Sequence, residues 1–382
     1  MTPFVGETER DLAGAVAEWA KALAPRIPAA EREGALPQDV IGELGKLGVL
    51  GMTIPEADGG LGASTVAFAL VLEELAAAWP SLSVGVAVNS GIVAGSIVRY
   101  GTPEQRRTWL PRLMDGNGLG AFALTEPTSG SDAASLKATA RPDGDGWVLD
   151  GRKQFITNAR YAPLVVALAR IGEPDPKRPS AGITAFVVPL DARGVTVGAS
   201  ERKLGLRASD TSALIFDGAR VGGDAVLGEP GKGFGIAMSG LDGGRIGIAA
   251  QSVGIARQAL ELARAYAKER RQFGRPIADF QALRFSLARA DAELSAARLL
   301  ALRAAWLRDR GRPFTREASM AKLYASEMAQ RATHAAVQIL GGNGYMRDYA
   351  VERYARDGRA TTIYEGTSEV QRLVIARSLL AA

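Results

Sequence analysis

The chain has 382 residues, of which 47% are hydrophobic and 23% charged, values typical of a soluble globular protein with two or three domains. It contains no cysteine, which excludes disulfides, cysteine nucleophiles, iron–sulfur clusters and cysteine-held zinc. One histidine, His334, argues against a histidine-based metal site, and we expect it on a helix face. The net charge of +5 is spread along the chain, so nucleic-acid binding is not indicated.

The N-terminal segment has no signal-peptide pattern, because charged residues from Glu7 to Asp11 interrupt it. We see no apolar run near the ~18 residues that a membrane span needs. We therefore expect a cytoplasmic protein without an integral membrane segment.

Residues 1–120 are predicted to form an N-terminal helical domain. Apolar residues recur at helical spacing from Leu12 to Leu23, and Thr102-Pro103-Glu104 is a helix-start signal. Further helices are expected at about 37–48, 64–78 and 82–98.

Residues 121–230 have a different residue pattern, with short β-rich runs separated by Gly, Pro and Asp. This pattern predicts antiparallel strands in a small barrel or sandwich, and the lack of intervening long helices argues against a doubly wound parallel sheet. The runs are 147–149, 164–168, 183–188, 195–197 and 213–216.

Residues 231–382 are predicted to form a helical bundle. Three stripes of mostly alanine and leucine, within 249–267, 283–304 and 318–339, advance in steps of three and four residues. Small side chains along these stripes allow the helices to pack closely.

Two glycine clusters do not support the common nucleotide-binding motifs. Gly116–Gly120 lies after a predicted helix and before a strand, which is the wrong context for a dinucleotide fold. Gly231–Gly233 lacks the spacing and the Ser/Thr of a P-loop.

The loop Leu124–Asp132 offers backbone amides and hydroxyls that could bind a phosphate or the polar edge of a ring system. The alternative is a solvated turn, which Pro127, Gly130 and Asp132 would favour.

Glu365-Gly366 places a carboxylate beside a glycine in a loop before a short C-terminal helix. Gly lets another molecule approach closely, and a partly desolvated carboxylate can act as a general base. The alternative is purely structural, with Ser368 and Gln371 forming a capping box at the helix start.

Six segments in order resemble the acyl-CoA dehydrogenases, most closely the short-chain, butyryl-type members. The resemblance covers essentially the whole chain. The segments are 124–132, 153–158, 242–245, 270–274, 338–345 and 364–367.

The resemblance implies a fold, a cofactor and a reaction. It implies an N-terminal helical domain, a central antiparallel β-barrel and a C-terminal four-helix bundle, assembled as a homotetramer (a dimer of dimers). FAD would lie between the barrel and the bundle and reach a neighbouring subunit. The reaction would be α,β-dehydrogenation of an acyl-CoA, with Glu365 as base, hydride passing to flavin N5 and electrons leaving to electron-transferring flavoprotein.

The resemblance also assigns roles residue by residue, with no metal. FAD would be contacted by Leu124, Thr125, Ser131, Phe155, Thr157, Arg270, Gln272, Phe273, Gln338, Gly341, Gly342, Thr367 and Glu369. Acyl-CoA would be contacted by Ser131, Asp242, Arg245, Tyr364 and Gly366. A local helix-terminal ion pair is the alternative for Asp242 and Arg245.

Three positions distinguish this chain within the family. Phe155 stands where most members have Trp, which keeps an aromatic face but loses the indole N–H. Gly244 occupies the position that carries the base in isovaleryl- and long-chain-type members, so Glu365 is the one base that the resemblance supports. Residues 80–98 contain no Lys or Arg, which disfavours a dicarboxylate substrate.

Two other functions fit the same motifs. One is an oxidase or monooxygenase of this fold that uses oxygen. The other is a catalytically silent flavin-binding protein, which the intact Glu365 disfavours.

Overall fold

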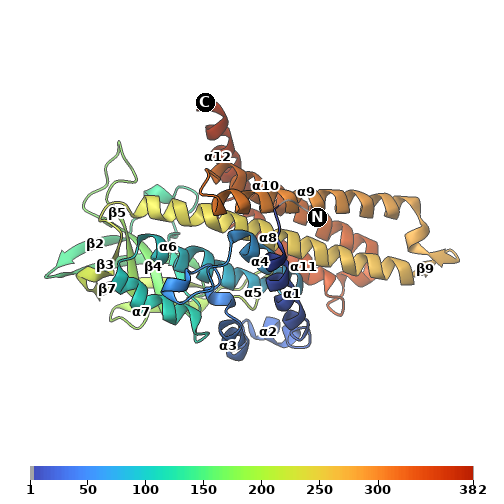
Figure 1. Ribbon diagram of the computed structural model, residues 1–382, viewed down its shortest axis with the longest axis horizontal. Helices are drawn as coiled ribbons and strands as arrows, with labels where there is room; N and C mark the ends of the chain where they lie inside the picture. The colour runs from blue at the N-terminus through green and yellow to red at the C-terminus, as the bar shows by residue number, and fades with distance from the viewer. Residues whose placement is uncertain (1–3, 382) are drawn as a thin grey trace.

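The computed structural model describes residues 4–381. A β-rich region lies at one end of the molecule, and long helices run from it toward the other end (Figure 1). The middle region is a sheet and the regions before and after it are helical, as the sequence predicts.

The N-terminal region is helical, and its caps follow the sequence signals. Ser64 accepts a hydrogen bond from the Ala67 N–H, and Thr102 forms a capping box with Gln105. The helices are α1 (Glu7–Lys21), α2 (Ile27–Glu33), α3 (Gln38–Lys46), α4 (Thr65–Ala78), α5 (Pro80–Val86), α6 (Gly95–Tyr100) and α7 (Pro103–Met114), with a π-helical segment, η3 (Ala87–Ala94), joining α5 to α6.

The segment Pro80–Tyr100 corrects one expectation from the sequence. It forms a helical run of 21 residues with a mean hydropathy of 1.6, long and apolar enough to cross a membrane. However, 83% of its most apolar window is buried inside the protein, which is typical of a core helix. Its apolar side chains pack against the sheet on one side and α8 (Gly233–Glu269) on the other.

The middle region is an eight-stranded sheet in the order β6-β7-β3-β2-β4-β5-β8, with β1 beside β4. The strands are β1 (Ala121–Ala123), β2 (Thr139–Asp143), β3 (Gly146–Thr157), β4 (Leu164–Ile171), β5 (Ile183–Pro189), β6 (Val195–Ser200), β7 (Thr211–Val221) and β8 (Val226–Leu227). All five predicted β runs lie in these strands, whereas the sequence pattern did not predict β2 and β8.

The predicted antiparallel barrel is wrong in two respects. The sheet is open, since β6 and β8 end its path without pairing with each other. In addition, β4 pairs in parallel with β1 and with β2. Alternating apolar runs identify strands, but pairing direction and closure depend on contacts between segments far apart in the chain.

The C-terminal region is helical. Its helices are α8, α9 (Gln281–Asp309), α10 (Thr315–Leu340), α11 (Val351–Gly358) and α12 (Ser368–Leu380), with a small hairpin of β9 (Arg271–Gln272) and β10 (Arg275–Pro276) after α8. Helices α8, α9 and α10 are much longer than α11 and α12. Helix α8 packs against α9, α10 and α11, and α4 from the N-terminal region packs against α8. A Cβ at Gly254 of α8 would lie 2.9 Å from the Ala76 Cβ, so glycine permits this close approach.

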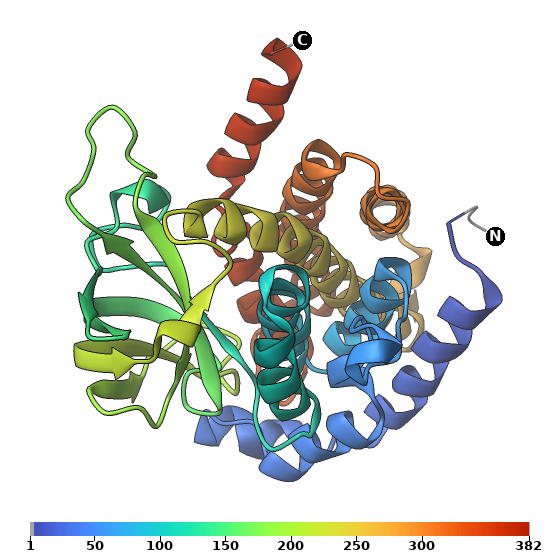
Figure 2. The same ribbon diagram turned by 60° about the vertical axis from the view of Figure 1, so that its left-hand side comes forward.

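Helix α12 begins against α10, and its C-terminal part projects away from the rest of the chain in both views (Figures 1 and 2). Its Leu373 and Leu380 are 64% and 85% exposed. His334 lies on an exposed face of α10, as the sequence predicts.

Candidate active site

Glu365 lies in a tight turn between a 3-10 turn, η8 (Arg359–Thr362), and α12. Its φ of +53° is a left-handed conformation, and Gly366 follows with φ +92°. A non-glycine residue in this conformation costs on the order of 1–3 kcal/mol and persists where its surroundings hold it. The Gly366 carbonyl accepts hydrogen bonds from Lys322 Nζ at 2.7 Å and Gln371 Nε2 at 2.9 Å.

The start of α12 differs from the capping box considered above. Thr367 is the N-cap, and its hydroxyl accepts from the Val370 N–H at 3.3 Å. Gln371 turns back to the Glu365–Gly366 turn instead of bonding a cap residue. This glutamine therefore supports the turn that presents Glu365.

The Glu365 carboxylate is shielded from solvent. Both of its oxygens are buried, and neither has a hydrogen-bond partner among residues 4–381. Burial raises the pKa of Glu365 to about 7, while Lys322 and Arg245 partly offset this rise. A buried carboxylate with both oxygens free is uncommon in folded proteins and is suited to taking a proton from a ligand.

Gly244 of α8 makes room for this carboxylate. A Cβ at position 244 would lie closer than 3.0 Å to Glu365 Oε2, 3.0 Å from Glu365 Cδ and 3.2 Å from Ile92 Cδ1. The glycine cannot serve as a base, and its missing side chain is what lets Glu365 occupy this position.

A small cavity of about 30 Å³ lies between the Pro80–Tyr100 helix and α8. Gly240, which lies one helical turn before Gly244, is part of its lining. The remaining lining residues are Gly91, Gly95, Ser96, Arg99, Tyr100, Ser239, Arg308 and Phe314.

A larger cavity, of about 840 Å³, lies between α1, α2, α8 and α11. It is lined by several Arg and Glu side chains and by none of the residues that the sequence assigned to FAD or acyl-CoA. We place the site at Glu365 because the free, buried carboxylate is there.

Asp242 and Arg245 form an ion pair beside the Glu365 turn. Arg245 Nη1 lies 2.6 Å from Asp242 Oδ1 and 3.3 Å from the Ser319 hydroxyl, and Asp242 Oδ2 accepts from Thr315 at 2.6 Å. The local ion pair considered above therefore exists, although it lies within α8 rather than at its end.

Tyr364 links the turn to the Pro80–Tyr100 helix. Its hydroxyl donates to Gln251 Oε1, and Gln251 Nε2 donates to the Pro80 carbonyl at 3.0 Å. Burial raises the pKa of Tyr364 well above its usual range, so the hydroxyl stays a proton donor.

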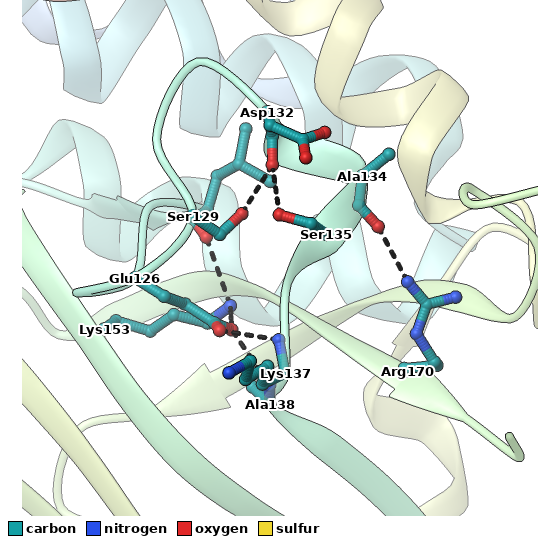
Figure 3. A network of polar contacts seen from close by, with 10 residues as sticks. Glu126, Ser129, Asp132, Ala134, Ser135, Lys137, Ala138, Lys153 and Arg170 are labelled. Atoms are coloured by element: carbon teal, nitrogen blue, oxygen red, sulfur yellow. Dashed lines mark hydrogen bonds and ion pairs between the residues drawn. The ribbon is translucent and has the colours of Figure 1, made fainter. Parts of the chain in front are cut away.

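The loop Leu124–Asp132 is held from beneath by a buried ion pair (Figure 3). Glu126 accepts from the backbone N–H groups of Lys137 and Ala138 and from Lys153 Nζ at 2.8 Å. The Glu126 and Lys153 side chains are 4% and 0% exposed. Ser129 donates to the Asp132 carbonyl at 2.7 Å. The loop is therefore held by internal hydrogen bonds and a buried ion pair and is not only a solvated turn.

The outer surface of this loop and the end of β3 remain open. Thr125 and Thr157 are half-buried, and Ser131 is exposed. Phe155 has φ +60° and is 62% exposed. This surface fits FAD, since it offers hydroxyls, backbone groups and an aromatic face beside the sheet.

Six of the remaining predicted FAD residues lie at the ends of α8 and α10 that are far from the sheet (Figure 1). Arg270, Gln272 and Phe273 follow the end of α8, and α8 rises about 39 Å from Gly244 to Arg270 at ~1.5 Å per residue. Gln338, Gly341 and Gly342 lie at the end of α10 and are also exposed. A single chain therefore does not bring these six residues to Glu365, whereas Thr367 and Glu369 lie at the start of α12 next to it.

Sequence reasoning missed Lys322 altogether. It also missed the contacts that Gln371 and Lys153 make and the space that Gly244 leaves for Glu365. Lys322 had a usable signal, because it follows Ala321 within an apolar stripe where a lysine is unusual. Lys153 gave no such signal, since its strand is only partly buried.

Family models match almost the entire chain. The acyl-CoA dehydrogenase N-terminal domain matches residues 6–117, the middle domain residues 121–219 and the C-terminal domain residues 231–380.

Individual relatives agree with the family models. The mitochondrial short-chain specific acyl-CoA dehydrogenase of Bos taurus is 46% identical over 360 residues, which cover 94% of this chain and 87% of that protein. The butyryl-CoA dehydrogenase structure from Megasphaera elsdenii has a TM-score of 0.96 and 39% identity over 100% of both chains. A structure described as the electron transferring flavoprotein of Acidaminococcus fermentans has a TM-score of 0.97 and 39% identity, again over 100% of both chains.

Solved relatives hold FAD or its reduced form. The chain therefore belongs to the acyl-CoA dehydrogenases, a family of FAD-binding oxidoreductases.

Proposed function

We propose that this enzyme dehydrogenates a short- or medium-chain acyl-CoA between its α and β carbons, giving the trans-2-enoyl-CoA. The observation that carries the proposal is the buried Glu365 carboxylate with both oxygens free. Its pKa of about 7 suits a group that is charged near neutral pH and still basic enough to remove a weakly acidic proton.

The protein residues act through position and charge. Glu365 takes the α-proton, and its backbone N–H holds the thioester oxygen, which stabilises the charge that develops there. FAD, when bound, would supply the acceptor for the β-hydride. Thr125, Ser131, Phe155 and Thr157 would hold the flavin beside the sheet.

Asp242, Arg245, Tyr364 and Gly366 would contact the acyl-CoA. Arg245 and Asp242 lie on α8 one residue or two from Gly244, so a thioester that reaches Glu365 passes beside them. The likeness to short-chain and butyryl-CoA dehydrogenases supports a short acyl group. The buried, uncharged segment 80–98 supports a monocarboxylic rather than a dicarboxylic acid.

A homotetramer, built as a dimer of dimers, would complete the FAD site. Arg270, Gln272, Phe273, Gln338, Gly341 and Gly342 would then serve the flavin of a neighbouring subunit. Phe273, which is 92% exposed, and the exposed leucines of α12 support burial against another chain.

We further propose a cytoplasmic enzyme that passes electrons to electron-transferring flavoprotein. Its three domains would comprise residues 1–120, 121–230 and 231–382. The structural likeness to the Acidaminococcus fermentans chain supports this electron acceptor.

Glu365→Gln tests the assignment of the base. This variant keeps the size and hydrogen-bonding capacity of the side chain, so FAD should stay bound while anaerobic flavin reduction by butyryl-CoA slows by at least ~10²-fold. Near-normal reduction in the variant would overturn the assignment.

The same preparation separates the alternative functions. Release of hydrogen peroxide, with no turnover using a dye acceptor, would favour an oxidase. Wild-type flavin that is not bleached by any acyl-CoA of a graded series would favour a silent flavin-binding protein.

A further inference from the structure

Lys322 is a buried cation close to Glu365. It lies on α10 and is 0% exposed, among the largest fully buried side chains of residues 4–381. Burying an ammonium group costs several kcal/mol unless charges and hydrogen bonds compensate it. A lysine in the apolar stripe between Ala318 and Ala325 therefore needs a physical reason.

The contacts of Lys322 point to the Glu365–Gly366 turn. Its Nζ donates to the Gly366 carbonyl at 2.7 Å, the same oxygen that Gln371 binds at 2.9 Å. No acidic oxygen within residues 4–381 lies within ion-pairing distance of Lys322, although Glu365 is the carboxylate that influences it most. The cation thus lies near the carboxylate without occupying its oxygens.

This arrangement differs from an ordinary buried ion pair. At Glu126, Lys153 binds the carboxylate directly, and that carboxylate is fully used in holding a loop. At Glu365 the cation binds the neighbouring carbonyl, so both carboxylate oxygens stay free.

We infer that Lys322 is a positioning residue for the dehydrogenation: it holds the strained Glu365–Gly366 turn, and its charge keeps the Glu365 carboxylate ionised while leaving both oxygens free to take the α-proton. This inference rests on the proposed role of Glu365 as base.

The other charges around Lys322 fit this role. Glu369 at the start of α12 and Glu327 on α10 favour its charged form, whereas Arg245 on α8 opposes it. Arg245 is itself paired with Asp242, at 2.6 Å. Burial lowers the pKa of Lys322 to about 8, and the lysine in turn lowers the pKa of Glu365 from the value that burial alone would give. Between about pH 7 and pH 8, more than half of each group is therefore charged.

Lys322→Met and Lys322→Gln, each as the FAD-loaded enzyme, test the inference. Without the cation the pKa of Glu365 should rise, so the acid limb of kcat/KM for butyryl-CoA should move to higher pH by roughly one unit or more. At the pH where the acid limb of the wild-type kcat/KM is half-maximal, this shift lowers kcat/KM by about 5-fold or more. The reason is that a rise of one unit in the pKa of Glu365 reduces its ionised fraction from about a half to about a tenth. Lys322→Gln keeps a donor for the carbonyl and carries the same test if Lys322→Met does not fold.

Gln371→Leu is the matched control. It removes the other hydrogen bond to the Gly366 carbonyl but no charge, so it should lower the rate without moving the acid limb. An unmoved acid limb in both Lys322 variants, or an equal shift in Gln371→Leu, would overturn the charge role of Lys322.

A second measurement does not depend on turnover. As pH rises, the difference in melting temperature between Glu365→Gln and its parent protein should grow until pH passes the pKa of Glu365 in the folded protein, and then stay constant. This plateau should begin near pH 7 in the wild-type background and at higher pH in the Lys322→Met background. Failure of the wild-type flavin to respond to any acyl-CoA would count against the proposed function. An unshifted plateau in a responsive enzyme would count against Lys322 alone.

Discussion

Gly244→Ala should separate catalysis from stability in this enzyme. A methyl group at position 244 would lie 3.0 Å from Glu365 Cδ and closer still to Oε2, whereas ordinary contacts begin at 3.4 Å. The obstructing atoms are the far end of a flexible side chain, so the protein can fold around the methyl group by displacing the carboxylate. Replacing a helical glycine with alanine contributes ~0.5–1 kcal/mol of stability, which offsets much of the local cost.

The catalytic cost should be much larger. The Glu365 Cδ must move by at least 0.4 Å to reach ordinary contact, and Oε2 must move further. A misplacement of ~1 Å at a reacting group can cost about 10²-fold in rate, so we expect flavin reduction by butyryl-CoA to slow ~10- to 100-fold. The melting temperature and the FAD content should stay close to those of the wild type.

Stopped-flow absorbance under anaerobic conditions measures this directly. Gly235→Ala is the control, because position 235 lies on the same helix with open space around its Cβ. That variant should reduce its flavin at the wild-type rate. Wild-type reduction in Gly244→Ala would show that Glu365 does not act from the position seen here.

Three further predictions concern other parts of the molecule. Lys153→Met leaves the buried Glu126 carboxylate without its cation, so we expect the free energy of unfolding to fall by ~3–5 kcal/mol and less FAD to stay bound. Both losses should be partly recovered in the double variant with Glu126→Gln. If thermal melts and flavin-to-protein absorbance ratios show no recovery, the pairing is contradicted. The raised pKa of Glu365 means that its contribution to stability falls as pH rises from about 4.5 to about 7. The free energy of unfolding of Glu365→Gln should therefore exceed that of the wild type by up to ~3 kcal/mol above pH 7 and by little at pH 4. If the two proteins are equally stable at both pH values, the burial cost of Glu365 is refuted. Phe273→Ala should shift sedimentation toward smaller assemblies and lower FAD retention, and an unchanged mass and flavin content would exclude Phe273 from the interface.

Sequence patterns predicted the helices well because their signals are local. The three alanine-rich stripes of the C-terminal region lie in α8, α9 and α10, and the start signal at Thr102 is a capping box in the structure. The barrel was wrong because closure is set by pairing between distant strands such as β6 and β8. The apolar length of Pro80–Tyr100 was underestimated because Ser and Asn residues interrupt the apolar run in the sequence, although they are buried in the structure.

The site was predictable where one segment carries the chemistry. Glu365 was singled out as a candidate base from its neighbouring glycine and from the family resemblance, and the structure shows its carboxylate buried with both oxygens free. Gly244 and Lys322 were missed as partners of Glu365 because they come from α8 and α10, and nothing local shows that these helices meet at the turn. Contacts of this kind depend on tertiary packing, which a single sequence does not encode by spacing.

The carboxylate that we propose as the base has to be shielded from water and charged at the same time, and these requirements oppose each other. Burial alone favours the protonated form of Glu365, while a direct ion pair would occupy the oxygens that must receive the proton. The structure meets both requirements by placing the cation one peptide away, on the Gly366 carbonyl, and by pairing the second nearby cation, Arg245, with Asp242. The left-handed backbone at Glu365 and Gly366 is part of the same arrangement, in which the Gly366 carbonyl bonds Lys322 of α10 and the carboxylate lies in the gap at Gly244. The strained Glu365–Gly366 turn, the buried Lys322 and the glycine at position 244 therefore act together on one carboxylate. Changing any of the three should affect the position or charge of Glu365 more than the stability of the fold.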